Sequence, residues 1–248
     1  MSLSNHYIYG KNPLLEQFKT EPGKIDKIFL RKNLRGSYVD EIMNLASQNR
    51  IPVSFVPGNK LHEMVGRVSD QGVAALVSPV SYLEFEDWLD DLEPDADTAI
   101  LLLDEIEDPH NFGAILRSAA AAGITAVLVP KHRQAPVSAT VVKTSAGTAG
   151  RIPIVRVSNL NQAILELKEH KFWIAGLDQN AGRSIWEMEA TVPLAFVIGS
   201  EDQGIRKKTG EHCDFHYAIP MQNRVESLNA SVSAALICFE WQRRQLNR

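Results

Sequence analysis

Residues 99–119, AILLLDEIEDPHNFGAILRSA, contain the pattern that decides the fold. Residues 99–103 form a continuous apolar run, which is typical of a strand covered on both faces of a parallel sheet. A polar turn follows over residues 104–111. Beyond the turn, apolar residues recur at i, i+3, i+4 and i+7, the spacing that buries one face of a helix: Phe112, Ile115, Leu116 and Ala119. The stretch therefore predicts a buried strand, a polar turn and a helix that packs back on the sheet.

The same alternation continues to the end of the chain. Alternating strands and helices predict an α/β fold with a mostly parallel sheet and crossover helices. Ligands in such sheets bind beyond the carboxyl ends of the strands. We expect further strands at residues 126–129, 152–155, 172–177, 194–198 and 215–219, and helices around residues 160–167 and 232–239.

The first third of the chain predicts a separate, smaller α/β domain. Residues 5–79 alternate short strand-like and helix-like pieces, and we assign residues 1–80 to this domain. Residues 81–97 hold eight acidic side chains and no Lys or Arg, and we interpret them as an acidic linker. Residues 98–248 then form the second, larger domain.

Composition indicates a soluble protein of ordinary kind. Hydrophobic residues make up 44% and charged residues 23% of the 248 residues, as in globular proteins. No apolar run approaches the roughly 20 residues of a membrane span, and the N-terminus lacks the features of a signal peptide. Two cysteines predict no disulfide framework, so we expect a cytoplasmic setting.

The net charge of −4 is concentrated in one segment. Removing the eight acids of residues 81–97 from the total of 30 leaves 22 acidic residues against 26 basic ones. The remainder of the chain can therefore present a basic face to phosphates, which permits RNA binding. A basic loop with Arg31, Lys32 and Arg35 follows one predicted strand. Charge alone favours a loop that is only exposed to solvent, and a loop that contacts RNA is the more specific alternative.

Three predicted strand ends carry Gly or polar loops: residues 176–177, 199–201 and 219–221. Their convergence at one edge of the sheet predicts a ligand site. Residues 199–206 have the Gly spacing of a phosphate-binding P-loop, but Ile205 and Arg206 stand where that motif requires Lys and Ser or Thr. Glu201 and Asp202 would also repel phosphates. The loop better suits a ligand with positive charge or ribose hydroxyls, and S-adenosylmethionine has both.

Structural roles compete with functional ones for the remaining polar residues. Spacing alone favours Asn111 as a helix N-cap and leaves Arg117 evenly balanced between a solvated helix residue and a site residue. Ser227 or Asn229 either caps the last helix or meets a ligand. A further group, His212, Cys213 and His216, has metal-ligand side chains without a second cluster, so we expect no metal site.

Three stretches together resemble a known family. Residues 108–119, 196–204 and 219–232 resemble, in order and spacing, the three motifs of the SpoU/TrmH (SPOUT) family of RNA 2'-O-ribose methyltransferases. Residues 9–13 and 70–74 make the N-terminal part similar to the ribosomal-protein-like substrate-binding domain of the bacterial 23S rRNA guanosine 2'-O-methyltransferases. Two positions depart from that pattern: Asp70 stands where His is usual, and Gly150 stands where Glu is common.

The resemblance implies a trefoil-knotted parallel-sheet domain, a homodimer and no metal. It implies transfer of a methyl group from S-adenosylmethionine to a ribose 2'-hydroxyl of structured RNA, most closely a guanosine of 23S rRNA. A tRNA methyltransferase and a non-catalytic RNA-binding dimer are the alternatives. The implied reaction centre comprises Asn111, Arg117, Glu201, Ser227 and Asn229, and the implied cofactor site comprises Leu177, Gly199, Ser200, Ile219 and Leu228, with Arg31, Lys32 and Arg35 as the candidate RNA contacts.

Overall fold

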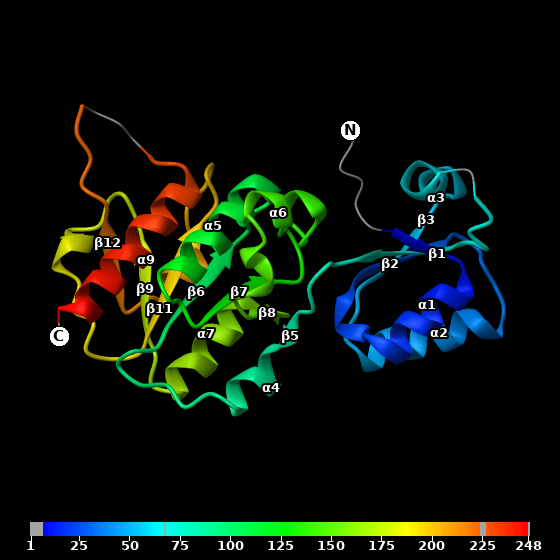
Figure 1. Cartoon of the computed structure of the whole chain (residues 1–248), viewed down its shortest axis with the longest axis horizontal. Helices are drawn as coiled ribbons and strands as arrows, with labels where there is room; N and C mark the ends of the chain where they lie inside the picture. Colours follow the sequence, from blue (N-terminus) through cyan, green and yellow to red (C-terminus); the bar gives the residue numbers. More distant parts are fainter. Residues whose placement is uncertain (1–6, 67, 224–226, 248) are drawn as a thin grey trace. The chain divides into compact units, whose positions relative to one another are not determined.

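A computed structural model describes residues 7–66, 68–223 and 227–247 (Figure 1). The chain divides into two compact units. Unit 1 comprises residues up to 81 together with residues 136–139, and unit 2 comprises residues 82–135 and residues from 140 onward. None of the helices in the described part of the chain is long and apolar enough to cross a membrane.

Unit 2 is built on a parallel sheet, as the alternation of strands and helices predicts. Eight strands of the described chain pair in the order β10-β12-β9-β11-β6-β7-β8-β5, and each pairing is parallel. The strands are β5 (Leu83–Glu84), β6 (Ala99–Asp104), β7 (Ala126–Pro130), β8 (Ile154–Val157), β9 (Trp173–Leu177), β10 (Arg183–Ser184), β11 (Leu194–Gly199) and β12 (Phe215–Ala218).

Helices cover both faces of this sheet (Figure 1). Helices α4 (Phe85–Asp90) and α7 (Leu160–Glu169) contribute buried apolar side chains to one core, together with Ile100 and Leu102 of β6. Alternate β6 residues such as Leu101 point to the opposite face, where α5 (Pro109–Ala121) and α9 (Ala230–Leu246) pack on each other. The shorter helices are α6 (Ala139–Thr144), α8 (Lys207–Gly210) and the 3-10 turns Thr148–Gly150 and Ile185–Glu187.

The segment interpreted as an acidic linker contributes to unit 2. Strand β5 pairs with β8, and Phe85 and Leu89 of α4 are buried in the core of the larger sheet. Burial of these apolar side chains holds the segment to the sheet, while its acidic residues account for its charge. The sequence also allows a short helix around Phe85 and Leu89, and the structure places that helix in the core of unit 2 rather than in a separate linker.

Among its described residues, unit 1 has a four-stranded sheet in the order β1-β4-β2-β3, in which β2 and β3 pair in parallel and the other pairs are antiparallel. Helices α1 and α2 supply a core on one face through Leu14, Phe18 and Ile42, and α3 places Leu61 against the other. The elements are β1 (Tyr7–Tyr9), α1 (Lys11–Thr20), a 3-10 turn (Pro22–Lys24), β2 (Ile25–Arg31), α2 (Ser37–Gln48), β3 (Val53–Val56), α3 (Gly58–Val65) and β4 (Val73–Val77).

Candidate functional site

A pocket of about 770 Å³ lies at the carboxyl edge of the parallel sheet, beyond β9, β11 and β12. Its size is that of a small-molecule site, since such pockets span roughly 300–1,000 Å³. The loops that follow these three strands and the start of α9 form its walls. The pocket is lined by each of the residues proposed for the cofactor: Leu177, Gly199, Ser200, Ile219 and Leu228.

The loop after β11 is a closed hairpin. Ser200 and Gly204 exchange two backbone hydrogen bonds, with the Ser200 N–H donating over 3.1 Å and the Gly204 N–H over 2.9 Å. A Cβ atom on Gly199 would lie only 2.0 Å from the backbone carbon of Gly204. Gly204 itself has a φ of +63°, which favours glycine. The two glycines therefore permit the tight turn that carries Glu201.

We expect Gly199→Ala to disrupt the pocket, because the added methyl group meets backbone rather than a flexible side chain. S-adenosylmethionine affinity, measured by isothermal titration calorimetry, should fall about tenfold or more, which corresponds to a loss of about 1.4 kcal/mol of binding free energy. Gly182→Ala is the control, since a Cβ atom there meets nothing within 4 Å. Unchanged affinity in Gly199→Ala would show that the hairpin does not shape the cofactor site.

The charge of the pocket favours a cationic ligand. Four carboxylates line it against the single lysine Lys207 among the described lining residues, and the carboxylates belong to Asp178, Glu201, Asp202 and Glu211. A sulfonium centre carries one positive charge, so this surplus of negative charge is complementary to it. Residues 178–180 were missed by the sequence analysis, although their polar character directly after a buried strand was the available signal.

Asn229 joins three elements beside this pocket. Its side-chain oxygen accepts hydrogen bonds from the backbone N–H of Ser231 at 2.9 Å and of Val232 at 3.4 Å, which makes it the N-cap of α9. Its amide nitrogen donates to Asn111 Oδ1 at 2.9 Å and to a carboxylate oxygen of Glu201. The oxygen of this amide thus provides the expected cap, while its nitrogen links the start of α9 to Asn111 and Glu201.

Asn111 is not the N-cap that its spacing favoured. Asp108 caps α5 by accepting a hydrogen bond from the His110 backbone N–H at 2.9 Å. Asn111 lies in the first turn of the helix, buried, with its side-chain oxygen directed to Asn229. The sequence pattern placed the helix start three residues too late, because two polar candidates precede the apolar stripe.

The structure unites three of the five proposed reaction-centre residues by direct hydrogen bonds: Asn111, Glu201 and Asn229. Ser227 lines the neighbouring pocket. The Arg117 side chain is exposed on α5 and has no hydrogen bond or ion pair with another described residue. It lies six residues after Asn111, which corresponds to about 9 Å along a helix axis. Residues 224–226 of the third motif lie outside the described residues.

Residues with metal-ligating side chains do not cluster in the described part of the chain: it holds no group of three or more His, Cys, Asp or Glu with metal-binding geometry. Burial raises the pKa of the Cys213 thiol to about 12, which disfavours the thiolate that binds metals. His216 Nε2 is instead 3.1 Å from the Gly210 carbonyl oxygen. Cys213 and His216 therefore make local contacts with the backbone of α8, at Thr209 and Gly210.

The candidate RNA contacts belong to unit 1. Arg31 ends β2, and Lys32 and Arg35 follow in the loop before α2. The three side chains are exposed, so their charges are accessible to phosphates. Asp70, at a position where the resembling proteins usually have His, is buried and accepts a hydrogen bond from the Gly72 backbone N–H at 2.7 Å.

Comparisons with known proteins agree with this architecture. Residues 98–239 match the model of the SpoU rRNA Methylase family, and residues 7–83 match a model described as RNA 2'-O ribose methyltransferase substrate binding. A relative from Staphylococcus epidermidis, described as a putative TrmH family tRNA/rRNA methyltransferase, is 40% identical over 222 residues, 89% of either chain. The chain belongs to the SpoU family, whose members are S-adenosylmethionine-dependent RNA 2'-O-methyltransferases.

Solved structures share the fold. The SpoU methyltransferase AviRb from Streptomyces viridochromogenes, crystallised with its cofactor AdoMet, has a TM-score of 0.62 at 22% identity over 98% of this chain and 91% of that chain. A structure titled RNA 2'-O ribose methyltransferase has a TM-score of 0.59 at 25% identity, covering 99% and 90% of the two chains. The α/β fold with an N-terminal domain and a parallel-sheet methyltransferase domain is therefore shared.

Proposed function

We propose that this protein transfers a methyl group from S-adenosylmethionine to the 2'-hydroxyl of a ribose in structured RNA. The observation that carries the proposal is the junction of an acidic pocket with a hydrogen-bonded polar cluster. The pocket suits the sulfonium donor. In this proposal the acceptor ribose approaches that donor beside the hydrogen-bonded cluster of Asn111, Glu201 and Asn229.

The transfer forms a bond between the ribose 2'-oxygen and the methyl carbon and breaks the bond from that carbon to sulfur. S-adenosylhomocysteine leaves, and the 2'-hydroxyl proton must be removed. Arg117 is the candidate for promoting that removal. Because arginine stays protonated in proteins, we favour a role in which its guanidinium binds the neighbouring phosphate, which then takes the proton. Positioning of the two reactants supplies most of the acceleration.

A guanosine of 23S rRNA is our preferred target. The match of residues 7–83 to a substrate-binding model supports a structured RNA substrate. Resemblance at residues 9–13 and 70–74 supports rRNA. A tRNA substrate is the second candidate, because the curated relatives are named for both RNAs and the A. aeolicus TrmH/SpoU tRNA modifying enzyme is 27% identical over 66% of this chain.

Mapping of 2'-O-methylation in total RNA, from cells with and without the gene, tests the function and names the nucleotide. We expect one methylated ribose to disappear with the gene and to return when purified protein and S-adenosylmethionine are added to the RNA. A site in tRNA would replace the rRNA assignment. An unchanged map, together with no transfer by the purified protein, would favour the non-catalytic alternative.

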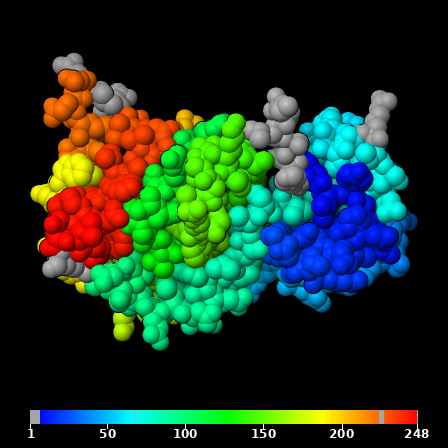
Figure 2. Space-filling model, viewed as in Figure 1, coloured from blue at the N-terminus to red at the C-terminus, as the bar shows by residue number. Residues whose placement is uncertain are grey.

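We further propose a homodimer of trefoil-knotted domains. An apolar hollow of about 360 Å³ between α5 and α9 supports the dimer, since Val232 and Phe239 are about half exposed beside it. Figure 2 shows the surfaces of these two helices side by side. Such exposed apolar patches mark interaction sites. Sedimentation equilibrium should give twice the monomer mass, and a Phe239→Glu variant should give the monomer mass.

Charge reversal of Arg31, Lys32 and Arg35 to Glu should weaken RNA binding and flatten its salt dependence. Each phosphate contact contributes about 0.9 to the slope of log affinity against log salt on a duplex. Loss of three contacts should therefore lower the slope by about 2 to 3, as measured by fluorescence anisotropy at several salt concentrations. S-adenosylmethionine affinity is the control and should not change. An unaltered slope would move the RNA-binding surface elsewhere.

A further inference from the structure

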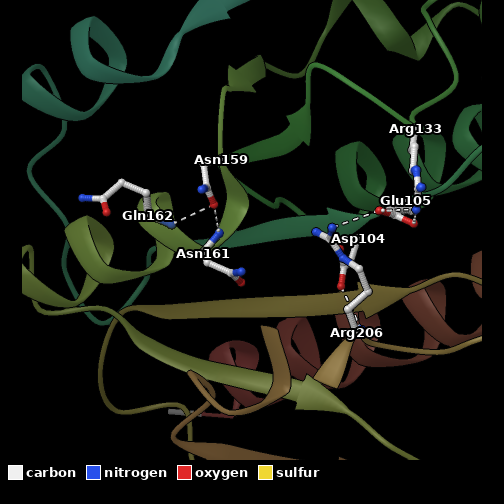
Figure 3. Close-up of polar contacts among 7 residues, drawn as sticks. All are labelled: Asp104, Glu105, Arg133, Asn159, Asn161, Gln162 and Arg206. Atoms are coloured by element: carbon white, nitrogen blue, oxygen red, sulfur yellow. Dashed lines mark hydrogen bonds and ion pairs between the residues drawn. The ribbon is translucent and has the colours of Figure 1, made fainter. Parts of the chain in front are cut away.

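A buried carboxylate lies at the end of β6, next to the loop that carries Glu201. Asp104 is fully buried. Arg206 donates to its Oδ1 from Nε at 2.7 Å and forms an ion pair from a terminal nitrogen at 2.6 Å, and the Arg206 backbone N–H donates to Oδ2 at 3.0 Å (Figure 3). A buried charge requires such a partner, because isolated burial of a carboxylate is very unfavourable.

Glu105 is a second carboxylate that pairs with Arg206. Its carboxylate lies 2.9 Å from the other terminal nitrogen of Arg206, while the largely exposed Arg133 approaches it less closely, at 3.4 Å (Figure 3). The backbone of Glu105 has a φ of +65°, a left-handed conformation that is unfavourable for a side chain with a Cβ atom. Residues in such conformations persist where surrounding contacts impose them. In this turn the Glu105 carboxylate contacts the Arg206 guanidinium.

Arg206 stands at the end of the hairpin that lines the cofactor pocket. Strands β6 and β11 are adjacent and parallel, with Gly199 paired to Asp104, so their loops leave the sheet side by side. The hairpin is linked to the chain segment around α5 once directly and once through Asn229. Glu201 connects to Asn111 through Asn229, and Arg206 connects directly to Asp104, four residues before the α5 N-cap Asp108.

We propose that Arg206 is a positioning residue for methyl transfer: its contact with Asp104 and Glu105 fixes the hairpin that carries Glu201 relative to α5. The inference rests on the proposed function of the pocket and of Asn111, Glu201 and Asn229. Arg206 itself does not line the cofactor pocket. It acts by keeping the donor side, formed by the β11 hairpin, in register with the acceptor side, formed by the first turn of α5.

Arg206 stays charged over the working pH range. Burial acts to lower the pKa of Arg206, but the hydrogen bond and charge of Asp104 and the charge of Glu105 outweigh it, and the net pKa is raised. A lysine cannot reproduce the arrangement, since its single ammonium lacks the planar fork that donates from two nitrogens. Arg206 is therefore required for its geometry as well as its charge.

The test compares Arg206→Lys with the double variant Asp104→Asn/Arg206→Gln, which removes both charges together and so leaves no buried carboxylate unpaired. Arg133→Gln is the control, because Arg133 contacts the same Glu105 without belonging to the hairpin. We expect single-turnover transfer to fall about 10- to 100-fold in both test variants, the range produced by small misplacement of reacting groups. Transfer by the control should stay within about twofold, and the KM for RNA should not change in any variant.

Melting temperature and S-adenosylmethionine affinity are measured on the same samples. A folded double variant with wild-type transfer rate would overturn the proposal, as would an equal loss in Arg133→Gln. A slower rate in a double variant that melts like the wild type supports positioning, because a purely structural contact would change melting alone. If wild-type protein binds S-adenosylmethionine but modifies no RNA, the proposed function fails instead. A change of S-adenosylmethionine affinity in the test variants alone would then still support hairpin positioning, and unchanged affinity would overturn it.

Discussion

Arg117→Ala should bind S-adenosylmethionine normally and lose about 100-fold or more of its methyl transfer activity. The side chain is exposed on α5 and has no hydrogen-bond or ion-pair partner among the described residues, so its removal leaves no buried group unsatisfied. We expect its guanidinium to bind the RNA phosphate next to the reacting ribose. Loss of one such donor from a reaction centre typically costs 10²- to 10³-fold in rate.

Single-turnover assays measure the loss of methyl transfer, and calorimetry measures S-adenosylmethionine binding, which should not change. Arg117→Lys retains the charge without the fork, and we expect it to recover only part of the rate. Arg133→Ala provides a second exposed arginine of unit 2 as the control. Full transfer by Arg117→Ala would remove this residue from the mechanism and leave proton removal to the cluster around Glu201.

Local sequence patterns predicted the elements of unit 2 well, because burial on a sheet or helix face repeats at a fixed spacing. The apolar run at residues 99–103 lies in β6, and the stripe from Phe112 to Ala119 lies in α5. The convergence of three strand ends on the pocket also followed from the sequence, since parallel strands end at one edge, but residues 178–180 of its lining did not. The family resemblance then named residues within those loops.

Contacts between distant parts of the chain were not accessible in the same way. Asp104 and Arg206 are 102 positions apart, and they meet because β6 and β11 are neighbours in the sheet. Strand order is not encoded in any local period. Arg206 appeared in the sequence only as the wrong residue for a P-loop. The resemblance grouped Asn229 with Asn111, but no local spacing predicted the hydrogen bond between them, because they lie 118 positions apart.

Replacing Asn229 should affect both stability and methyl transfer, because its amide oxygen caps α9 and its amide nitrogen binds Asn111 and Glu201. Asn229→Ala removes the cap of α9 together with the hydrogen bonds to Asn111 and Glu201. Loss of an N-cap costs about 1 kcal/mol of stability. The freed Asn111 and Glu201 side chains lose their shared orientation, so we expect transfer to fall on the order of 100-fold.

Asn159→Ala is a matched control for the stability effect. Asn159 caps α7 in the same manner, accepting from Asn161 N–H at 3.0 Å and Gln162 N–H at 3.3 Å, and it does not line the proposed cofactor pocket (Figure 3). Urea unfolding should show similar losses of about 1 kcal/mol for both alanine variants. Transfer by the folded protein should fall only in Asn229→Ala.

Asn229→Ser separates the two ends within one position. Serine caps helices about as well as asparagine, but its short hydroxyl cannot replace the amide that reaches both Asn111 and Glu201. We therefore expect near wild-type stability and most of the loss of transfer seen with alanine. If Asn229→Ser regains both stability and transfer, the cap alone is what the reaction needs. The contact joining the start of α5 to the β11 hairpin would then be a consequence of folding rather than a condition for catalysis.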